Sequence, residues 1–163
     1  MIHLIVGNTG AGKSTYAKRL KEERGGVIFT IDQWNKVLFL PDKTSSDGFD
    51  WFMERLNRSE SLMMELIIQL ESNQTDSILD LGFSTFDHRE KFRSFARDHG
   101  LECALHFLDV SSTIRKQRVK QRNMEKGDTF EFEVSEEDFA FMESHFEAPT
   151  KEEMENGLYL RST

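Results

Sequence analysis

The feature that most constrains this chain of 163 residues is a glycine-rich stretch that follows its first apolar run. Residues 2–6 read Ile-His-Leu-Ile-Val, and residues 7–15 read Gly-Asn-Thr-Gly-Ala-Gly-Lys-Ser-Thr. The spacing Gly-x4-Gly-Lys-Ser is that of a phosphate-binding P-loop, which joins a strand to a helix. We therefore expect a buried strand over residues 2–6 and a helix that begins near Lys13.

The side chains of this stretch suit a nucleoside triphosphate bound with Mg²⁺. Glycines allow successive N–H groups to point at one anion, and the start of the helix adds its positive dipole end. Lys13 can bridge the β- and γ-phosphates, Ser14 can bind Mg²⁺, and Thr15 can donate to the α-phosphate. The alternative is a glycine-rich turn before an ordinary helix. The predicted nucleotide-binding residues of the stretch are Asn8, Thr9, Gly10, Ala11, Gly12, Lys13, Ser14 and Thr15.

Two aspartates follow later apolar runs. Asp32 comes after residues 27–31, and Asp80 comes after residues 77–79. Because ligands bind where the carboxyl ends of parallel strands meet, we expect both carboxylates beside the P-loop. Asp80 can orient Mg²⁺ together with Ser14, and Asp32 can accept a proton from an attacking hydroxyl. The alternative is that each caps a turn or helix, Asp32 the short helix expected over residues 33–39.

A basic segment carries Arg115, Arg118 and Arg122. Their spacings of three and four residues place them on one face of a helix expected over residues 112–124. Guanidinium groups suit phosphate oxygens and can also stack on a purine. The alternative is a solvated face that pairs with Asp or Glu.

The rest of the chain alternates between strand-like and helix-like segments. This alternation predicts a parallel sheet covered on both faces, and no linker divides residues 1–163, so we expect a single domain. Residues 127–134 are expected to form a mobile insert. Further strands are expected over residues 77–82, 101–110 and 158–160, and helices over residues 13–23, 49–71, 87–99 and 135–146.

Composition narrows the function further. With 29 acidic against 21 basic residues and a net charge of −8, extended nucleic-acid binding is disfavoured, because that binding neutralises phosphates. No apolar stretch approaches the ~18 residues of a membrane span. The start of the chain lacks a signal-peptide layout, so a cytoplasmic protein is expected. The five histidines have no metal-ligand spacing, and His3 and His106 are expected in the core or at its edge.

Several segments together resemble one branch of the P-loop kinases. They are residues 7–15, Asp32, residues 78–85 (Ile-Leu-Asp-Leu-Gly-Phe-Ser-Thr), the basic segment 115–123 and residues 130–149, which end in Phe-Glu-Ala-Pro. The branch holds polynucleotide 5′-kinases, zeta toxins, gluconate kinases and chloramphenicol phosphotransferases. The resemblance implies an adenylate-kinase-like, three-layer αβα fold. It implies a five-stranded parallel sheet in the order 2-3-1-4-5, with an arginine-bearing lid over about residues 115–135.

The resemblance also implies roles for single residues. Asp32 matches the catalytic base, Arg118 lies against adenine, and Arg122 contacts the transferring phosphate beside Lys13. Arg115 matches less securely. The leading hypothesis is therefore a kinase that uses ATP and Mg²⁺ and phosphorylates a hydroxyl of a small molecule. The candidate contacts to that acceptor are Asp32, Trp34, Arg55 and Arg89.

Two other hypotheses stay open. In a 5′-hydroxyl polynucleotide kinase, Arg55, Arg58 and Arg89 would contact phosphates, although they could be ordinary solvated helix charges. In a nucleotide-dependent switch or toxin-like interaction protein, aromatic side chains would form a partner-binding face, although helical aromatics are more often core. Those aromatic residues are Trp34, Phe49, Trp51 and Phe52.

Overall fold

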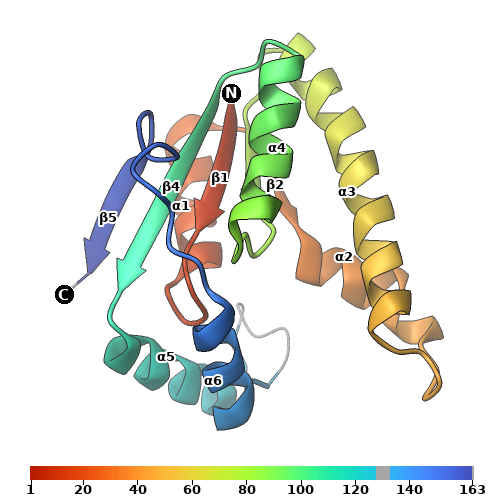
Figure 1. Ribbon diagram of the computed structural model, residues 1–163, viewed down its shortest axis with the longest axis vertical. Helices are drawn as coiled ribbons and strands as arrows, with labels where there is room; N and C mark the ends of the chain where they lie inside the picture. The colour runs from red at the N-terminus through yellow and green to blue at the C-terminus, as the bar shows by residue number, and fades with distance from the viewer. Residues whose placement is uncertain (128–132, 163) are drawn as a thin grey trace.

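The computed structural model describes residues 1–127 and 133–162, and its centre is one parallel sheet (Figure 1). Every strand pair is parallel, and the order is β2-β3-β1-β4-β5, as predicted. The carboxyl ends of the strands point towards α5 and α6. The strands are β1 (Ile2–Val6), β2 (Val27–Thr30), β3 (Ser77–Asp80), β4 (Cys103–Val110) and β5 (Leu158–Ser162).

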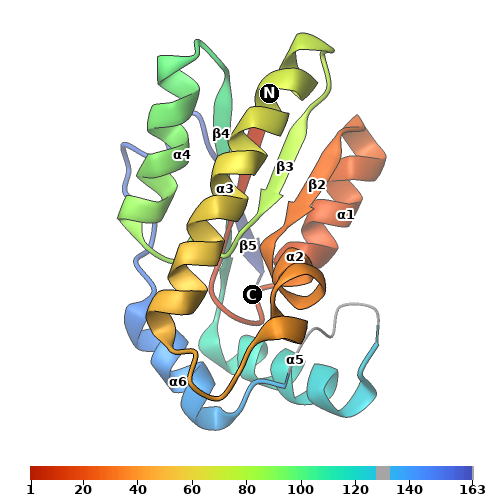
Figure 2. The same cartoon turned by 90° about the vertical axis from the view of Figure 1, so that its right-hand side faces the viewer.

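Helices cover both faces of the sheet, which confirms the three-layer αβα fold (Figure 2). Side chains alternate along β1: Leu4 packs with α3 and α4, whereas Ile5 packs with α1 on the other face. The helices are α1 (Lys13–Arg24), α2 (Ile31–Leu38), the short 3-10 helix η1 (Leu40–Asp42), α3 (Phe49–Ser72), α4 (Phe86–Asp98), α5 (Ser112–Glu125) and α6 (Glu136–His145).

The boundary between β2 and α2 differs from the prediction. The strand ends at Thr30, which is the N-cap residue of α2, and Asp32 is already the second residue of the helix. The alternative that Asp32 caps this helix is therefore wrong. Ser135 does open α6, through reciprocal hydrogen bonds with Asp138. Of the mobile insert predicted over residues 127–134, residues 128–132 lie outside the described residues.

His3 and His106 lie in the core, as expected, within a buried chain of hydrogen bonds. His3 Nε2 lies 3.1 Å from Asp76 Oδ2, and His3 Nδ1 lies 2.9 Å from His106 Nε2. The Tyr16 hydroxyl lies 2.7 Å from His106 Nδ1. Because the Asp76 carboxylate only accepts, one assignment satisfies every group: Tyr16 donates to His106, His106 to His3, and His3 to Asp76. Both histidines are neutral in this arrangement.

No helix in the described ranges 1–127 and 133–162 is long and apolar enough to cross a membrane.

Candidate active site

The P-loop connects β1 to α1, and its shape depends on glycine. Gly10 has φ 81° and Gly12 has φ 93°, values in the left-handed region that favours glycine. A Cβ atom at Gly10 would lie 2.6 Å from the backbone oxygen of Arg115, so the loop also needs glycine there to pack on α5. Gly12 precedes the first turn of α1, which carries no acidic side chain and receives no side-chain cap. The backbone N–H groups of that turn are therefore available to an anion.

Lys13 lies inside the curve of this loop. Its Nζ donates to the backbone oxygen of Gly7 at 2.9 Å. Burial lowers the pKa of Lys13, and the carboxylates of Asp80 and Asp32 act in the opposite direction. The amino group is thus held among backbone oxygens and near two carboxylates, the position from which it can reach phosphate oxygens.

Ser14 and Asp80 meet because β1 and β3 are neighbours in the sheet. Ser14 Oγ donates to Asp80 Oδ2 at 2.7 Å, and Asp80 is buried at the end of β3. A hydroxyl and a carboxylate side by side fit Mg²⁺, which takes one or two protein oxygens and completes its octahedron with water and phosphate. Within the described residues, no group of three or more His, Cys, Asp or Glu side chains could hold a metal ion without such help.

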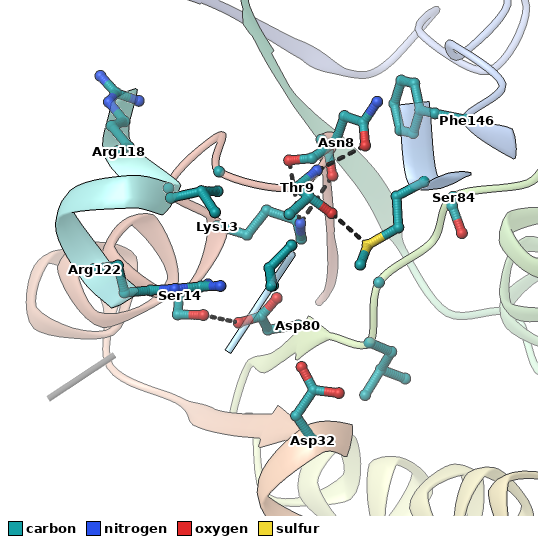
Figure 3. Close-up of a pocket in the computed structure, with 18 of the residues that line it drawn as sticks. Asn8, Thr9, Lys13, Ser14, Asp32, Asp80, Ser84, Arg118, Arg122 and Phe146 are labelled. Carbon is teal, nitrogen blue, oxygen red and sulfur yellow. Dashed lines mark hydrogen bonds between the residues drawn. The ribbon is translucent and has the colours of Figure 1, made fainter. Parts of the chain in front are cut away.

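Arg122 has buried hydrogen-bonding capacity that the described part of the chain does not use. Its Nε and Nη2 atoms are buried and have no hydrogen-bond partner among the residues that the structure describes. Burial lowers the pKa of Arg122, an effect that the nearby Asp32 carboxylate opposes. The side chain points towards Ser14, and Asp32 faces the same space from α2 (Figure 3). Buried guanidinium donors of this kind require an acceptor, and phosphate oxygens are their strongest partners.

The other two arginines of α5 have different environments. Arg118 lies at the rim of the P-loop, where its Nη1 donates to the backbone oxygen of Ala11 at 3.2 Å. Arg115 is buried and donates to the backbone oxygens of Val110 at 2.8 Å and Thr9 at 3.2 Å. It also forms an ion pair at 2.8 Å with Glu143 of α6. Arg115 therefore joins the P-loop to two helices and does not line the cavity.

These elements enclose a cavity of about 500 Å³. Its described lining residues include the predicted Asp32, Asp80, Arg118 and Arg122, and all eight predicted P-loop positions except Ala11. Ala11 is buried against α1 and β4. The space matches the usual size of a small-molecule site.

One side of the cavity was not predicted from the sequence. It is formed by α6 and by the loop that follows β3. Helix α6 also contacts the P-loop, because Thr9 Oγ1 lies 2.7 Å from the sulfur of Met142 and Asn8 Nδ2 donates to Glu143 at 3.2 Å. The signal in the sequence that could have indicated this side was the segment 130–149, which was part of the kinase resemblance. The residues of this side are Ser84, Phe141, Met142, His145 and Phe146.

The environment of Arg89 differs from the prediction that it contacts the acceptor. Its side chain is 0% exposed and forms a two-point ion pair with Glu153, at 2.6 Å from Nε and 3.2 Å from Nη2. Its Nη1 donates to the backbone oxygens of Phe83 and Glu147. The prediction that Arg89 contacts an acceptor is therefore wrong, because none of its guanidinium is accessible.

The two remaining predicted acceptor contacts, Trp34 and Arg55, do not line the cavity. Trp34 packs against Phe29 and the main hydrophobic core. The guanidinium of Arg55 lies 3.8 Å from the ring centre of Trp51 and donates to the backbone oxygen of Trp51. A cation–π contact of this type uses the face that would otherwise meet a ligand.

The sheet order and the P-loop define the fold as that of a P-loop NTPase. The sequence profile of a family described as an AAA domain matches residues 2–149, so the chain belongs to that family. No protein of curated function matches the chain.

Solved structures share the fold at low sequence identity. Kti12 from Chaetomium thermophilum, in complex with ADP-AlF3, has a TM-score of 0.71 and 10% identity over 99% of this chain and 89% of that one. A gluconokinase from Sinorhizobium meliloti 1021 has a TM-score of 0.62 and 16% identity, covering 98% and 81%. A sugar kinase from Janibacter sp. HTCC2649 has a TM-score of 0.58 and 18% identity, covering 98% and 84%.

Proposed function

We propose that the protein is a kinase that uses ATP and Mg²⁺ and transfers the γ-phosphate to a hydroxyl of a small molecule. One observation carries the proposal: Asp32 and the buried nitrogens of Arg122, which have no hydrogen-bond partner among the described residues, face the same cavity as Lys13 and the Ser14–Asp80 pair. A P-loop alone would bind nucleotide. A carboxylate and an arginine placed across from it add what transfer to an acceptor requires.

Each residue has a distinct role in the proposed reaction. Lys13 and the first turn of α1 bind the β- and γ-phosphates, and Arg122 stabilises the charge on the transferring group. Arg118 lies further out, on the nucleotide side. Asp32 accepts the proton of the acceptor hydroxyl. At the same time the hydroxyl oxygen bonds to the γ-phosphorus, and the bond between the γ-phosphorus and the β–γ bridging oxygen breaks. Mg²⁺ at Ser14 and Asp80 would neutralise charge on the phosphates.

The structural neighbours support this proposal at the level of reaction class. Two of them are a gluconokinase and a sugar kinase, and Kti12 binds ADP-AlF3, a nucleotide with a phosphoryl mimic. The use of a triphosphate also favours a cytoplasmic location.

The substitution Asp32→Asn tests the proposal. Labelled γ-phosphate transfer from ATP to pooled metabolites should fall at least ~100-fold, because the amide cannot accept the proton. ATP affinity, measured by titration calorimetry, should change less than about threefold, since Asp32 does not hold the nucleotide. The matched control is Asp42→Asn, which removes an exposed carboxylate from η1 outside the cavity. An Asp32→Asn protein that turns over an identified acceptor at the wild-type rate would refute the proposal.

A second candidate is a nucleotide-dependent interaction protein with slow hydrolysis. It is favoured by a group of exposed apolar side chains at the end of α2, in η1 and at the start of α3. Those side chains are Val37, Leu38, Leu40 and Phe49. Steady ATP hydrolysis with no acceptor, unchanged by Asp32→Asn, would support this candidate over the kinase.

Oligonucleotides with 5′-hydroxyl ends belong in the same screen, since transfer to them would indicate a polynucleotide kinase.

A further inference from the structure

We propose that the acceptor is an uncharged alcohol with an apolar face, bound between Asp32 and the opposite side of the cavity. That side, here named the acceptor wall, consists of Ser84, Phe141, Met142, His145 and Phe146. The inference rests on the proposed kinase function and names its substrate class.

The positive charge of the described lining residues lies around the P-loop. Among the described residues, the Lys and Arg side chains that line the cavity are Lys13, Arg118 and Arg122. Figure 3 shows both arginines on one side of the cavity and Ser84 and Phe146 on the other, with Lys13 and Asp80 between them. All three cations thus lie where the triphosphate is expected. Residues 128–132 are Asp, Thr, Phe, Glu and Phe by sequence, and none of them can add a cation.

An anionic acceptor would therefore bind next to the Asp32 carboxylate with no further cation to neutralise the charge of the acceptor. Like charges close to a catalytic carboxylate repel, and they raise the pKa of the base. The cations that the sequence suggested for such an acceptor are engaged elsewhere: Arg89 with Glu153, Arg55 over Trp51, and Arg58 with Glu54 outside the cavity. An uncharged acceptor avoids this repulsion.

The wall is held in place by contacts between two segments that are far apart in the sequence. Arg89 donates to the backbone oxygens of Phe83 and Glu147, at 3.1 and 2.8 Å, and thereby joins the loop after β3 to the segment after α6. The N–H of Glu147 donates to the backbone oxygen of Ser84 at 2.8 Å. Phe83 is fully buried and has φ 43°, a strained value for a non-glycine residue. Strain of this kind persists only where the surroundings impose it, so the wall is held in place before a ligand binds.

The wall has three apolar members and two polar ones. Phe146 packs on Phe107 of the core and presents a ring to the cavity, next to Phe141 and Met142. Ser84 and His145 are the polar members. His145 Nδ1 lies 2.8 Å from the backbone oxygen of Phe141, which can only accept, so Nδ1 carries the proton and Nε2 is left for a ligand. Aromatic faces with a few polar groups suit a ring with one apolar face and several hydroxyls.

The test does not require the acceptor to be known. A metabolite extract is separated on anion- and cation-exchange resins into anionic, cationic and neutral fractions, and each fraction is incubated with the protein and γ-labelled ATP. Transfer to the neutral fraction, at least ~10-fold above the other two, is the expected result. Transfer mainly to the anionic or cationic fraction would overturn this inference and leave the kinase proposal intact. Transfer to no fraction would contradict the kinase proposal itself.

A variant then links the result to the wall. Phe141, 62% exposed, can be shortened with little effect on the core. With the neutral acceptor, Phe141→Ala should raise the acceptor KM at least ~5-fold and leave the KM for ATP unchanged. Phe49→Ala is the matched control, because Phe49 is 75% exposed and lies outside the cavity. An increase confined to the KM for ATP would assign Phe141 to the nucleotide and overturn the assignment of the wall.

Discussion

The two sides of the cavity are built in opposite ways. The phosphate side is organised around nine consecutive residues, 7–15, whose shape follows from glycine conformations and from the helix that they start; Asp80, Arg118 and Arg122 join it from other elements. The acceptor wall depends on contacts between residues far apart in sequence, such as Arg89 with Glu153, 64 positions later. The phosphate-binding chemistry that many proteins share is thus encoded mainly by a local stretch of sequence, whereas selectivity for the acceptor depends on packing between distant residues. If the two sides are independent, a substitution on one side should leave the binding properties of the other side unchanged.

The largest effect is expected from breaking the ion pair beneath the wall. Arg89→Met leaves Glu153 buried without its partner, which should lower the free energy of unfolding by about 3–5 kcal/mol in urea titrations. The double variant Arg89→Met/Glu153→Gln should recover part of this loss, because the uncompensated charge is gone. At temperatures where Arg89→Met remains folded, the acceptor KM should rise more than the KM for ATP. Equal changes in both would contradict the separation between the two sides.

The next largest effect is expected for Arg122→Gln, and it concerns the activation free energy of phosphate transfer and not the free energy of unfolding. Loss of a donor to the transferring group should lower kcat about 10²–10³-fold, or about 3–4 kcal/mol of transition-state stabilisation. The free energy of unfolding should stay the same or rise slightly, since the buried, unpartnered nitrogens are removed. Lys120→Gln is the control, because it removes one positive charge from an exposed position of the same helix. Equal losses of activity in both variants would indicate a nonspecific charge effect.

Much of the phosphate side could be read from the sequence. The contact of Ser14 with Asp80 and the face that Arg118 and Arg122 share follow from local spacing and from the rule that carboxyl ends of strands converge, whereas the strand order was implied by the resemblance to P-loop kinases. Arg89 shows why the wall could not be read in the same way. Arg89 was predicted to contact the acceptor, with a solvated helix charge as the alternative, because its partner Glu153 lies in a turn that carries no motif. One signal was present: Arg89, Phe92 and Ala96 are spaced three and four residues apart and form the buried face of α4.

Acid should affect the buried His3–His106 chain at a higher pH than the Arg89–Glu153 pair beneath the wall. Burial lowers the pKa of His106 to about 4, and the adjacent His3 adds to this effect; burial likewise lowers the pKa of His3. Since the unfolded histidines bind protons near pH 6.5, stability from the His3–His106 chain is complete above pH 6.5. It is lost as the pH falls towards 4, by about 1.4 kcal/mol per unit of pKa difference for each histidine.

The Arg89–Glu153 pair should respond only at lower pH. Burial alone would raise the pKa of Glu153, but hydrogen bonds from Arg89 and from the backbone of Thr150 lower it below 4.5. Its contribution is therefore intact above pH 4.5 and is lost below that value. Urea titrations between pH 7 and 4.5 should show a fall that His106→Gln reduces and that Glu153→Gln does not alter. A fall that persists unchanged in His106→Gln would contradict the assignment to the buried histidines.

The smallest effect is expected at Glu143, the residue that connects the two sides. It pairs with Arg115 at 2.8 Å and accepts from Asn8 at 3.2 Å, and its side chain is 41% exposed. Solvent screens such a pair, so Glu143→Gln should lower the free energy of unfolding by about 1 kcal/mol. Because the amide oxygen of the substituted side chain could still accept from Asn8, the KM for ATP should rise only about two- to threefold. The control Glu155→Gln removes an exposed carboxylate from the turn after α6. If Glu143→Gln also raised the acceptor KM to the extent seen with Phe141→Ala, the two sides would be coupled through α6, and selectivity would depend on how firmly the P-loop is held against that helix.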